Sequence, residues 1–206
     1  VFNNGQAGSD VQLVIGLKLI GMKKYNEALA SFQMALTPPE KLRAQQGRNA
    51  RQSQITYWIG CAYDALGQKD KAKQSWTEVV TPPATRGNRP GGGSGCGLSM
   101  TNQGEQRYFV ALAQKKLGTG DKGEAVFKEL AATNTSPASD QSDNPGDPQF
   151  VDARRLPSRE NMATPHYTVG LGYAGLGNKI YARKEFTAAL ASAPDFLSAK
   201  IALDLL

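Results

Sequence analysis

One spacing of residues recurs four times along this chain, and it constrains the fold more than any other feature. Each copy runs through five positions that are separated by steps of 3, 4, 5 and 4 residues. The copies are Gly16, Leu19, Lys23, Ala28 and Phe32; Gly60, Tyr63, Gly67, Ala72 and Trp76; Ala111, Gln114, Gly118, Gly123 and Phe127; and Gly170, Tyr173, Gly177, Ala182 and Phe186. A small residue, a loop glycine, a second small residue and an aromatic residue are typical of two helices packed closely across a turn. The spacing therefore predicts a scaffold of repeated helix–turn–helix units.

Apolar residues follow the period of an α-helix in eight segments. The predicted helix pairs span 10–22 and 26–37, 51–66 and 70–81, 104–117 and 121–132, and 162–176 and 179–193. Asp10 and Asn26 are predicted to cap the first two helices, because such side chains accept hydrogen bonds from free backbone N–H groups. Pairs of prolines, which cannot continue a helix, follow Thr37 and Thr81, and these threonines lie 44 residues apart. Gly16 and Gly60 are separated by the same 44 residues, which supports a repeat.

The pairs define four predicted units within one all-α domain that spans residues 1–206. The units cover about 10–39, 51–83, 104–133 and 162–194. A final helix over 198–206 is predicted to cap the exposed apolar edge of the last unit, as the end of a repeat array requires. Two insertions, 84–103 and 134–160, are rich in turn-forming and small polar residues and are predicted to be long loops.

The repeated residues resemble the tetratricopeptide repeat. The fourth unit matches the pattern of that family nearly throughout, and Ala189 and Pro194 extend the match beyond the five shared positions. The first unit departs from the pattern at Leu19 and Lys23, and the third at Ala111 and Gly123. The resemblance implies a right-handed superhelix of about four units. The second and fourth units also look like the C-terminal repeat region of large bacterial proteins in which a β-rich, carbohydrate-enzyme-like region precedes the repeats.

The family resemblance also implies which residues would contact a ligand, because in tetratricopeptide arrays the first helix of each pair lines a concave groove. The corresponding residues here are Leu13, Leu17, Tyr57, Cys61, Asp64, Tyr108, Leu112, Lys115, Tyr167 and Leu171. Tyrosine combines apolar area with a hydroxyl group, which suits a recognition surface. The alternative is that the tyrosines pack against neighbouring helices or against an insertion that folds into the groove. Tyr, Leu and Cys replace the Lys, Asn and Arg with which family members hold acidic tails, so an extended apolar peptide, an amphipathic helix or a neighbouring domain fits better.

Charge and cysteine content argue against several other classes of protein. The net charge is +6, but the basic residues lie in loose clusters rather than in the dense tract that nucleic-acid binding needs. No apolar run reaches the ~18 residues of a membrane span, so we expect neither nucleic-acid binding nor membrane insertion. Cys61 and Cys96 lack the partnered spacing of a metal site, and no cofactor is expected.

Catalysis finds little support in the sequence. Its one histidine, His166, stands at the start of a predicted helix and is interpreted as a packing or capping residue rather than a base. The predicted function is a non-catalytic scaffold whose groove binds a peptide or a neighbouring domain. Two alternatives stay open: an accessory repeat region of a larger carbohydrate-active protein, and a structural repeat protein that assembles with its own copies.

Overall fold

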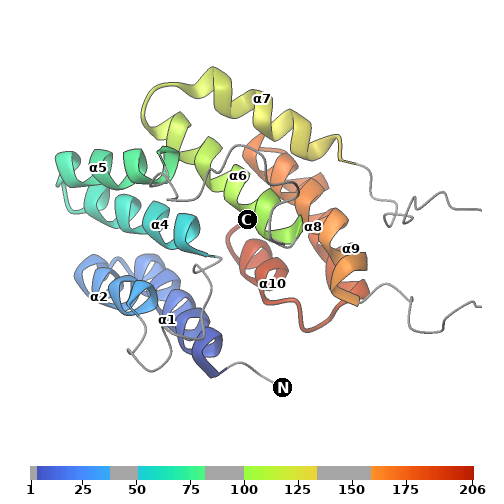
Figure 1. Cartoon of the computed structure of the whole chain (residues 1–206), viewed down its shortest axis with the longest axis horizontal. Helices are drawn as coiled ribbons and strands as arrows, with labels where there is room; N and C mark the ends of the chain where they lie inside the picture. Colours follow the sequence, from blue (N-terminus) through green and yellow to red (C-terminus); the bar gives the residue numbers. More distant parts are fainter. Residues whose placement is uncertain (1–3, 38–50, 82–99, 134–158) are drawn as a thin grey trace, which may run out of the picture. The chain divides into compact units, whose positions relative to one another are not determined.

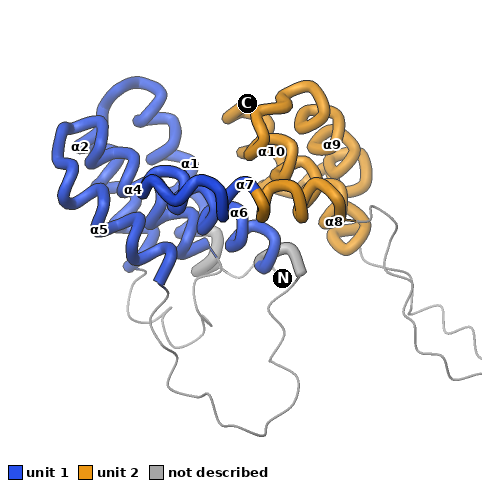
Figure 2. Tube along the Cα trace, turned by 90° about the horizontal axis from the view of Figure 1, so that it is seen from above, with its two compact units in different colours: residues 1–124 blue, residues 125–206 orange. Residues whose placement is uncertain are grey.

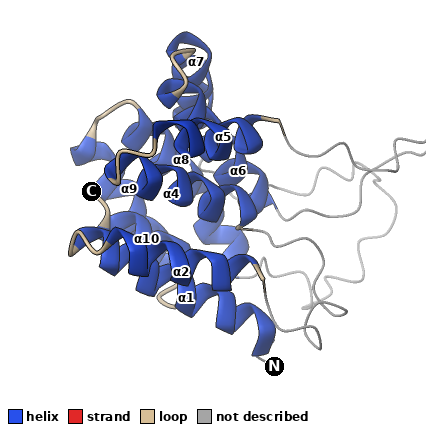
Figure 3. Cartoon of the chain, turned by 90° about the vertical axis from the view of Figure 1, so that its left-hand side faces the viewer, coloured by secondary structure: helices blue, strands red, loops and turns tan. Residues whose placement is uncertain are grey.

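The computed structural model describes residues 4–37, 51–81, 100–133 and 159–206, and all regular structure in these ranges is helical (Figure 1, Figure 3). The helices are α1 (Asn4–Gly21), α2 (Tyr25–Leu36), α4 (Gln52–Ala65), α5 (Lys69–Val80), α6 (Met100–Lys116), α7 (Gly120–Ala131), α8 (Arg159–Gly175), α9 (Lys179–Ser192) and α10 (Leu197–Asp204). Neighbouring helices pack in consecutive pairs. The predicted all-α fold of paired helices is therefore confirmed.

The helices gather into two compact units, which Figure 2 draws in blue and orange. Unit 1 covers Val1–Glu124, and unit 2 covers Ala125–Leu206. Within unit 1, α4 packs on α1 and α2, and α6 packs on α4 and α5. Within unit 2, α9 packs on both α8 and α10, and the last residues of α7 pack on α8. The prediction of a single domain over residues 1–206 stays a prediction.

The turn inside each helix pair has the same backbone geometry in all four copies of the repeat. The third repeat position is Lys23, Gly67, Gly118 or Gly177, and each of these residues has a positive φ, between 61° and 87°. The N–H of the following residue donates a hydrogen bond of 2.9–3.0 Å to the carbonyl of the second repeat position, five residues earlier. This pattern is that of a Schellman motif, which satisfies carbonyls at the end of the first helix. The spacing between the second and third positions is therefore set by the turn.

The first repeat position marks where the two helices of a pair approach most closely. A Cβ atom on Gly16, Gly60 or Gly170 would lie 2.4–2.5 Å from the ring of Phe32, Trp76 or Phe186, respectively. Each of these rings is at most 4% exposed, and burying such a side chain contributes roughly 2–3 kcal/mol. The ring of the second helix thus occupies the space that a side chain on the first helix would fill.

The third pair reaches the same close approach with the two small residues exchanged. Alanine replaces glycine at position 111, and glycine replaces alanine at position 123 of the second helix. A Cβ atom on Gly123 would lie 2.6 Å from the carbonyl oxygen of Ala111. The methyl group has moved from one helix to the other, which explains how this pair keeps the close approach with residue types that differ from those of the other three pairs.

Two further glycines of α8 are explained by the helix that precedes it. A Cβ atom on Gly172 would lie 2.3 Å from the backbone nitrogen of Ala131, and one on Gly175 would lie 2.3 Å from the ring of Phe127. Both contacts are made with α7 and lie within unit 2. Helix α8 is therefore closely approached from two sides, by α7 and by α9.

The predicted N-caps at Asp10 and Asn26 are wrong. Helix α1 begins at Asn4, which places Asp10 inside the helix, and Asn26 is the second residue of α2. The cap of α2 is Lys24, which makes no side-chain capping hydrogen bond. The preceding turn fixes where α2 begins, so a capping side chain is not what selects the boundary.

The predicted insertions are shorter than expected at their C-terminal ends. Helix α6 begins at Met100 and α8 at Arg159, so the ends of the predicted loops 84–103 and 134–160 are helical. The other residues of those two loops, Cys96 among them, lie outside the described residues. The predicted capping helix over 198–206 corresponds to α10, which packs on α9.

We predict opposite effects of alanine at two glycines that lie at equivalent turns. Gly67→Ala places a Cβ at a φ of 77° and should lower the free energy of unfolding by about 1 kcal/mol. Gly21→Ala meets no atom within 4 Å and should raise it by roughly 0.5–1 kcal/mol, because alanine restricts the unfolded chain. Urea unfolding followed by circular dichroism measures both. Equal effects of the two substitutions would contradict the described turn.

We predict that one added methyl group at a helix crossing destabilises the chain. Gly170→Ala brings a Cβ to 2.5 Å from the Phe186 ring, and this overpacking should cost roughly 1–3 kcal/mol. Gly60→Leu and Ala182→Leu should act in the same direction. A thermal unfolding scan checks the prediction, with Gly21→Ala as the control. An unchanged melting temperature for Gly170→Ala would show that the two helices are not so close.

Candidate binding surface on the first helices

The residues predicted to line a groove lie on the first helices α1, α4, α6 and α8, but they differ in exposure. Leu13, Tyr57, Tyr167 and Leu171 are buried, with exposed fractions between 0% and 7%. Leu17, Cys61, Tyr108 and Leu112 are half-buried, whereas Asp64 and Lys115 are exposed. The surface that a partner can reach is therefore smaller than the full set and more polar.

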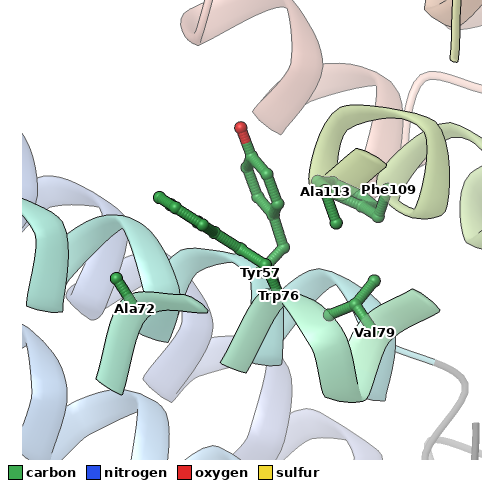
Figure 4. Close-up of a cluster of buried hydrophobic side chains, with 6 residues drawn as sticks. All are labelled: Tyr57, Ala72, Trp76, Val79, Phe109 and Ala113. Atoms are coloured by element: carbon green, nitrogen blue, oxygen red, sulfur yellow. The ribbon is translucent and has the colours of Figure 1, made fainter. Parts of the chain in front are cut away.

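Tyr57 belongs to the contact between consecutive helix pairs in unit 1. Its ring centroid lies 5.6 Å from that of Phe109 on α6. Figure 4 shows both residues in one apolar cluster with Ala113 of α6 and with Ala72, Trp76 and Val79 of α5. Burial raises the pKa of the Tyr57 hydroxyl far above its usual value. The side chain thus packs against neighbouring helices, as the alternative interpretation of the tyrosines expects.

Tyr167 occupies the corresponding position in unit 2 and is covered in a comparable way. Its ring centroid lies 5.9 Å from that of Phe186 on α9 and 5.1 Å from that of Phe196, the residue just before α10. The residue that precedes α10 therefore supplies an aromatic ring where the next pair supplies Phe109 in unit 1.

Tyr108 differs from the other two tyrosines because part of its surface stays open. Its ring meets that of Phe109 edge to face at 5.2 Å. Burial nevertheless raises the pKa of Tyr108 to about 12, so the reachable part of this side chain is offered mainly as apolar area. Of the three predicted tyrosines, Tyr108 offers a partner the most contact area.

Cys61 lies one residue beyond the close crossing at Gly60. Burial raises the pKa of its thiol, while a hydrogen bond with Tyr57 and the charge of Lys116 act in the opposite direction. The net rise keeps the thiol protonated at neutral pH, and a protonated thiol is a poor nucleophile and metal ligand. These surroundings suit an apolar contact.

Opposite charges lie at the C-terminal ends of α4 and α6. Asp64 Oδ2 is 4.0 Å from Lys116 Nζ, and both side chains are nearly half exposed. The Lys116 ammonium also lies 5.5 Å from the ring centroid of Trp76. An exposed ion pair contributes little to stability, about 0–1 kcal/mol, so these charges are free to exchange partners with a ligand.

A buried charge network, which sequence reasoning missed, joins the first helices of unit 1 near their N-terminal ends. Arg51 Nε lies 2.8 Å from Asp10 Oδ1 on α1, and Arg51 Nη1 lies 3.8 Å from Glu105 Oε1 on α6. Arg51 Nη1 also donates to Gln54 Oε1 on α4 at 3.3 Å. The arginine and glutamate side chains are 12% and 4% exposed. The network ties three helices to one guanidinium.

A signal for this network was present in the sequence. Asp10, Gln54 and Glu105 each stand six residues before the small residue of their unit, and Thr164 stands at that place in the fourth unit. Thr164 is also buried, and its hydroxyl donates to the carbonyl of Glu160 at 2.7 Å. A polar residue at the same position of every predicted apolar helix indicates a buried polar contact.

His166 joins the two helices of the fourth pair. Its Nδ1 lies 2.8 Å from Glu185 Oε2, and both side chains are half-buried. No group of three or more His, Cys, Asp or Glu side chains gathers as a metal site in the part of the chain that the structure describes. His166 lies in the interior of α8 rather than at its start, so its interpretation as a capping residue is wrong. Its contact with Glu185 on α9 is compatible with a packing role.

Comparison with known proteins gives no family assignment: no family model, no curated protein and no solved structure matches the chain. Among the described helices, none is both long and apolar enough to cross a membrane. The paired helices, the shared turn geometry and the equivalent positions on the first helices therefore carry the functional argument.

We predict that Arg51→Met lowers the free energy of unfolding by roughly 2–3 kcal/mol, because it leaves two carboxylates without their shared cation. Asp10→Asn and Glu105→Gln remove those two negative charges. The triple variant, which combines both substitutions with Arg51→Met, should therefore recover part of the lost free energy of unfolding. Urea unfolding of the three proteins measures the difference. If the triple variant is less stable than Arg51→Met, the network does not act through charge.

Proposed function

We propose that the chain is a non-catalytic interaction scaffold of the tetratricopeptide type, which binds an extended peptide along the first helices of its pairs. The proposal places the helices in a right-handed superhelix of about four units. The observation that carries it is the set of reachable side chains at equivalent positions of the neighbouring helices α4 and α6. These are Cys61, Asp64, Tyr108, Leu112 and Lys115.

The chemistry of these side chains suggests what a peptide would need. Tyr108 and Leu112 lie within two turns of α6 and offer apolar area. Asp64 and Lys115 are exposed and carry opposite charges. A peptide with an apolar residue flanked by an acidic and a basic residue complements this surface, and charge pairs at its rim would fix the direction of binding.

The burial of Tyr57 and Tyr167 changes how the proposal is tested. Truncating either tyrosine would remove core contacts, so a loss of binding would say nothing about a groove. Substitutions at the exposed charges avoid this difficulty. Helix α5 carries a matched pair of opposite charges, because Asp70 and Lys73 are also exposed.

The test is selection of peptides from a random displayed library on the immobilised chain, followed by affinity measurement. Peptides selected by wild type should bind Asp64→Lys/Lys115→Glu at least tenfold more weakly, since a charge-assisted hydrogen bond contributes roughly 1.5–3 kcal/mol. They should bind the control Asp70→Lys/Lys73→Glu with unchanged affinity, and circular dichroism checks that both variants are folded. The proposal fails if no peptide is enriched, or if both double variants weaken binding equally.

A further inference from the structure

The outer side of α1 carries an exposed apolar stripe that the packing of unit 1 leaves uncovered. Val11, Ile15 and Met22 are 55%, 40% and 67% exposed, and the exposed Lys18 lies between them. The four residues follow one another at steps of 4, 3 and 4. Met22 follows the last residue of α1, and its N–H still donates to the carbonyl of Lys18 at 3.0 Å. The spacing therefore places the four residues along one side of the helix and its C-terminal end, in the order that the seam of a coiled coil uses.

The same repeat positions are buried in the next pair. Ile55 and Ile59 of α4 correspond to Val11 and Ile15, since each isoleucine stands 44 residues further along the chain. They are 0% and 8% exposed, and α4 packs on the preceding helices α1 and α2. Helix α1 thus exposes the apolar residues whose counterparts in α4 are buried.

Lys18 breaks this correspondence. The residue two positions after the first repeat position is Ala62, Ala113 or Gly172 in the other units, and each of them is buried. Ala113 lies in the cluster with Trp76 and Val79 of the preceding second helix (Figure 4). Gly172 lies so close to α7 that a Cβ would be 2.3 Å from the backbone of Ala131. A lysine leaves no room for such an approach, so another pair cannot stack on α1 as the inner pairs stack.

A helix held further away can still cover the stripe. Coiled-coil seams keep two helices about 8–10 Å apart and tolerate a single polar seam residue, which then selects the partner. Among the described residues, Lys18 has no carboxylate partner. A second copy of the chain would bring Lys18 against Lys18 in a parallel pairing, or against apolar residues in an antiparallel one. Neither pairing gives Lys18 an opposite charge, so its charge favours a partner other than a second copy of the chain.

We propose that the outer stripe, formed by Val11, Ile15 and Lys18 of α1 and by Met22 just after it, docks an amphipathic helix of another protein. That helix presents apolar residues at the same 4–3 spacing and one carboxylate that faces Lys18. The stripe is separate from the peptide surface on α4 and α6, and either proposal can fail without the other.

The test uses two synthetic helical peptides of about four turns, with leucine at the seam positions and either glutamate or lysine opposite Lys18. Fluorescence anisotropy measures their binding to the full chain. Wild type should bind the glutamate peptide at least tenfold more tightly than the lysine peptide, and Lys18→Glu should reverse this order. Lys73→Glu on α5 is the control variant and should leave the order unchanged. Ile15→Asp should abolish binding of both peptides.

Three results would overturn the proposal. The first is that neither peptide binds wild type, and the second is that Lys18→Glu leaves the preference unchanged. The third is a concentration-dependent dimer of wild type, seen by analytical ultracentrifugation and abolished by Ile15→Asp, which would identify a second copy as the occupant. Since Lys18 is exposed, the reversal stays informative even if Ile15→Asp unfolds the chain.

Discussion

The contact between a glycine of one helix and an aromatic ring of the next determines how the helices of a pair meet. Gly16, Gly60 and Gly170 each leave space that a ring fills, and no heavy atom can be added there without displacing the ring. The aromatic side chain can then be buried on two sides. In the second pair, Trp76 belongs to one apolar cluster with Phe109 and Ala113 of the following helix. One close approach thus positions both the partner helix and the next pair.

This constraint explains why some parts of the structure could be predicted from the sequence. The repeat positions mark a turn of fixed length and the residues at which the two helices of a pair approach each other. Their spacing in the sequence therefore predicted both the helix pairs and the turns. Lys23 had only its place in the spacing to suggest a loop position, yet it adopts the left-handed geometry of the turn glycines. Helix ends were less predictable, because α1, α6 and α8 begin upstream of the periodic apolar residues that define their cores.

The candidate site was harder to predict for a related reason. The sequence pattern identifies which residues occupy equivalent positions of the helices. It does not show how far each of these residues is buried by the neighbouring helices. Tyr57 and Tyr167 fill space against Phe109 and Phe196, and neither aromatic partner belongs to the repeated spacing. The charge network escaped notice because Arg51 stands at a helix boundary, where basic residues are usually interpreted as solvated. Asp10 and Glu105 are the only acidic residues of the predicted helices 10–22 and 104–117.

The charge network at Arg51 gives the first helices of unit 1 a difference in stiffness along their length. Near their N-terminal ends, one largely buried guanidinium holds α1, α4 and α6 together. Near the other end, the ion pair between α4 and α6 is that of Asp64 and Lys116, and both side chains are exposed. A molecule that binds along these helices therefore meets a preorganised end and an adjustable end. The conformational entropy lost on binding would come mainly from the adjustable end, where sequence variation in the bound molecule is most easily accommodated.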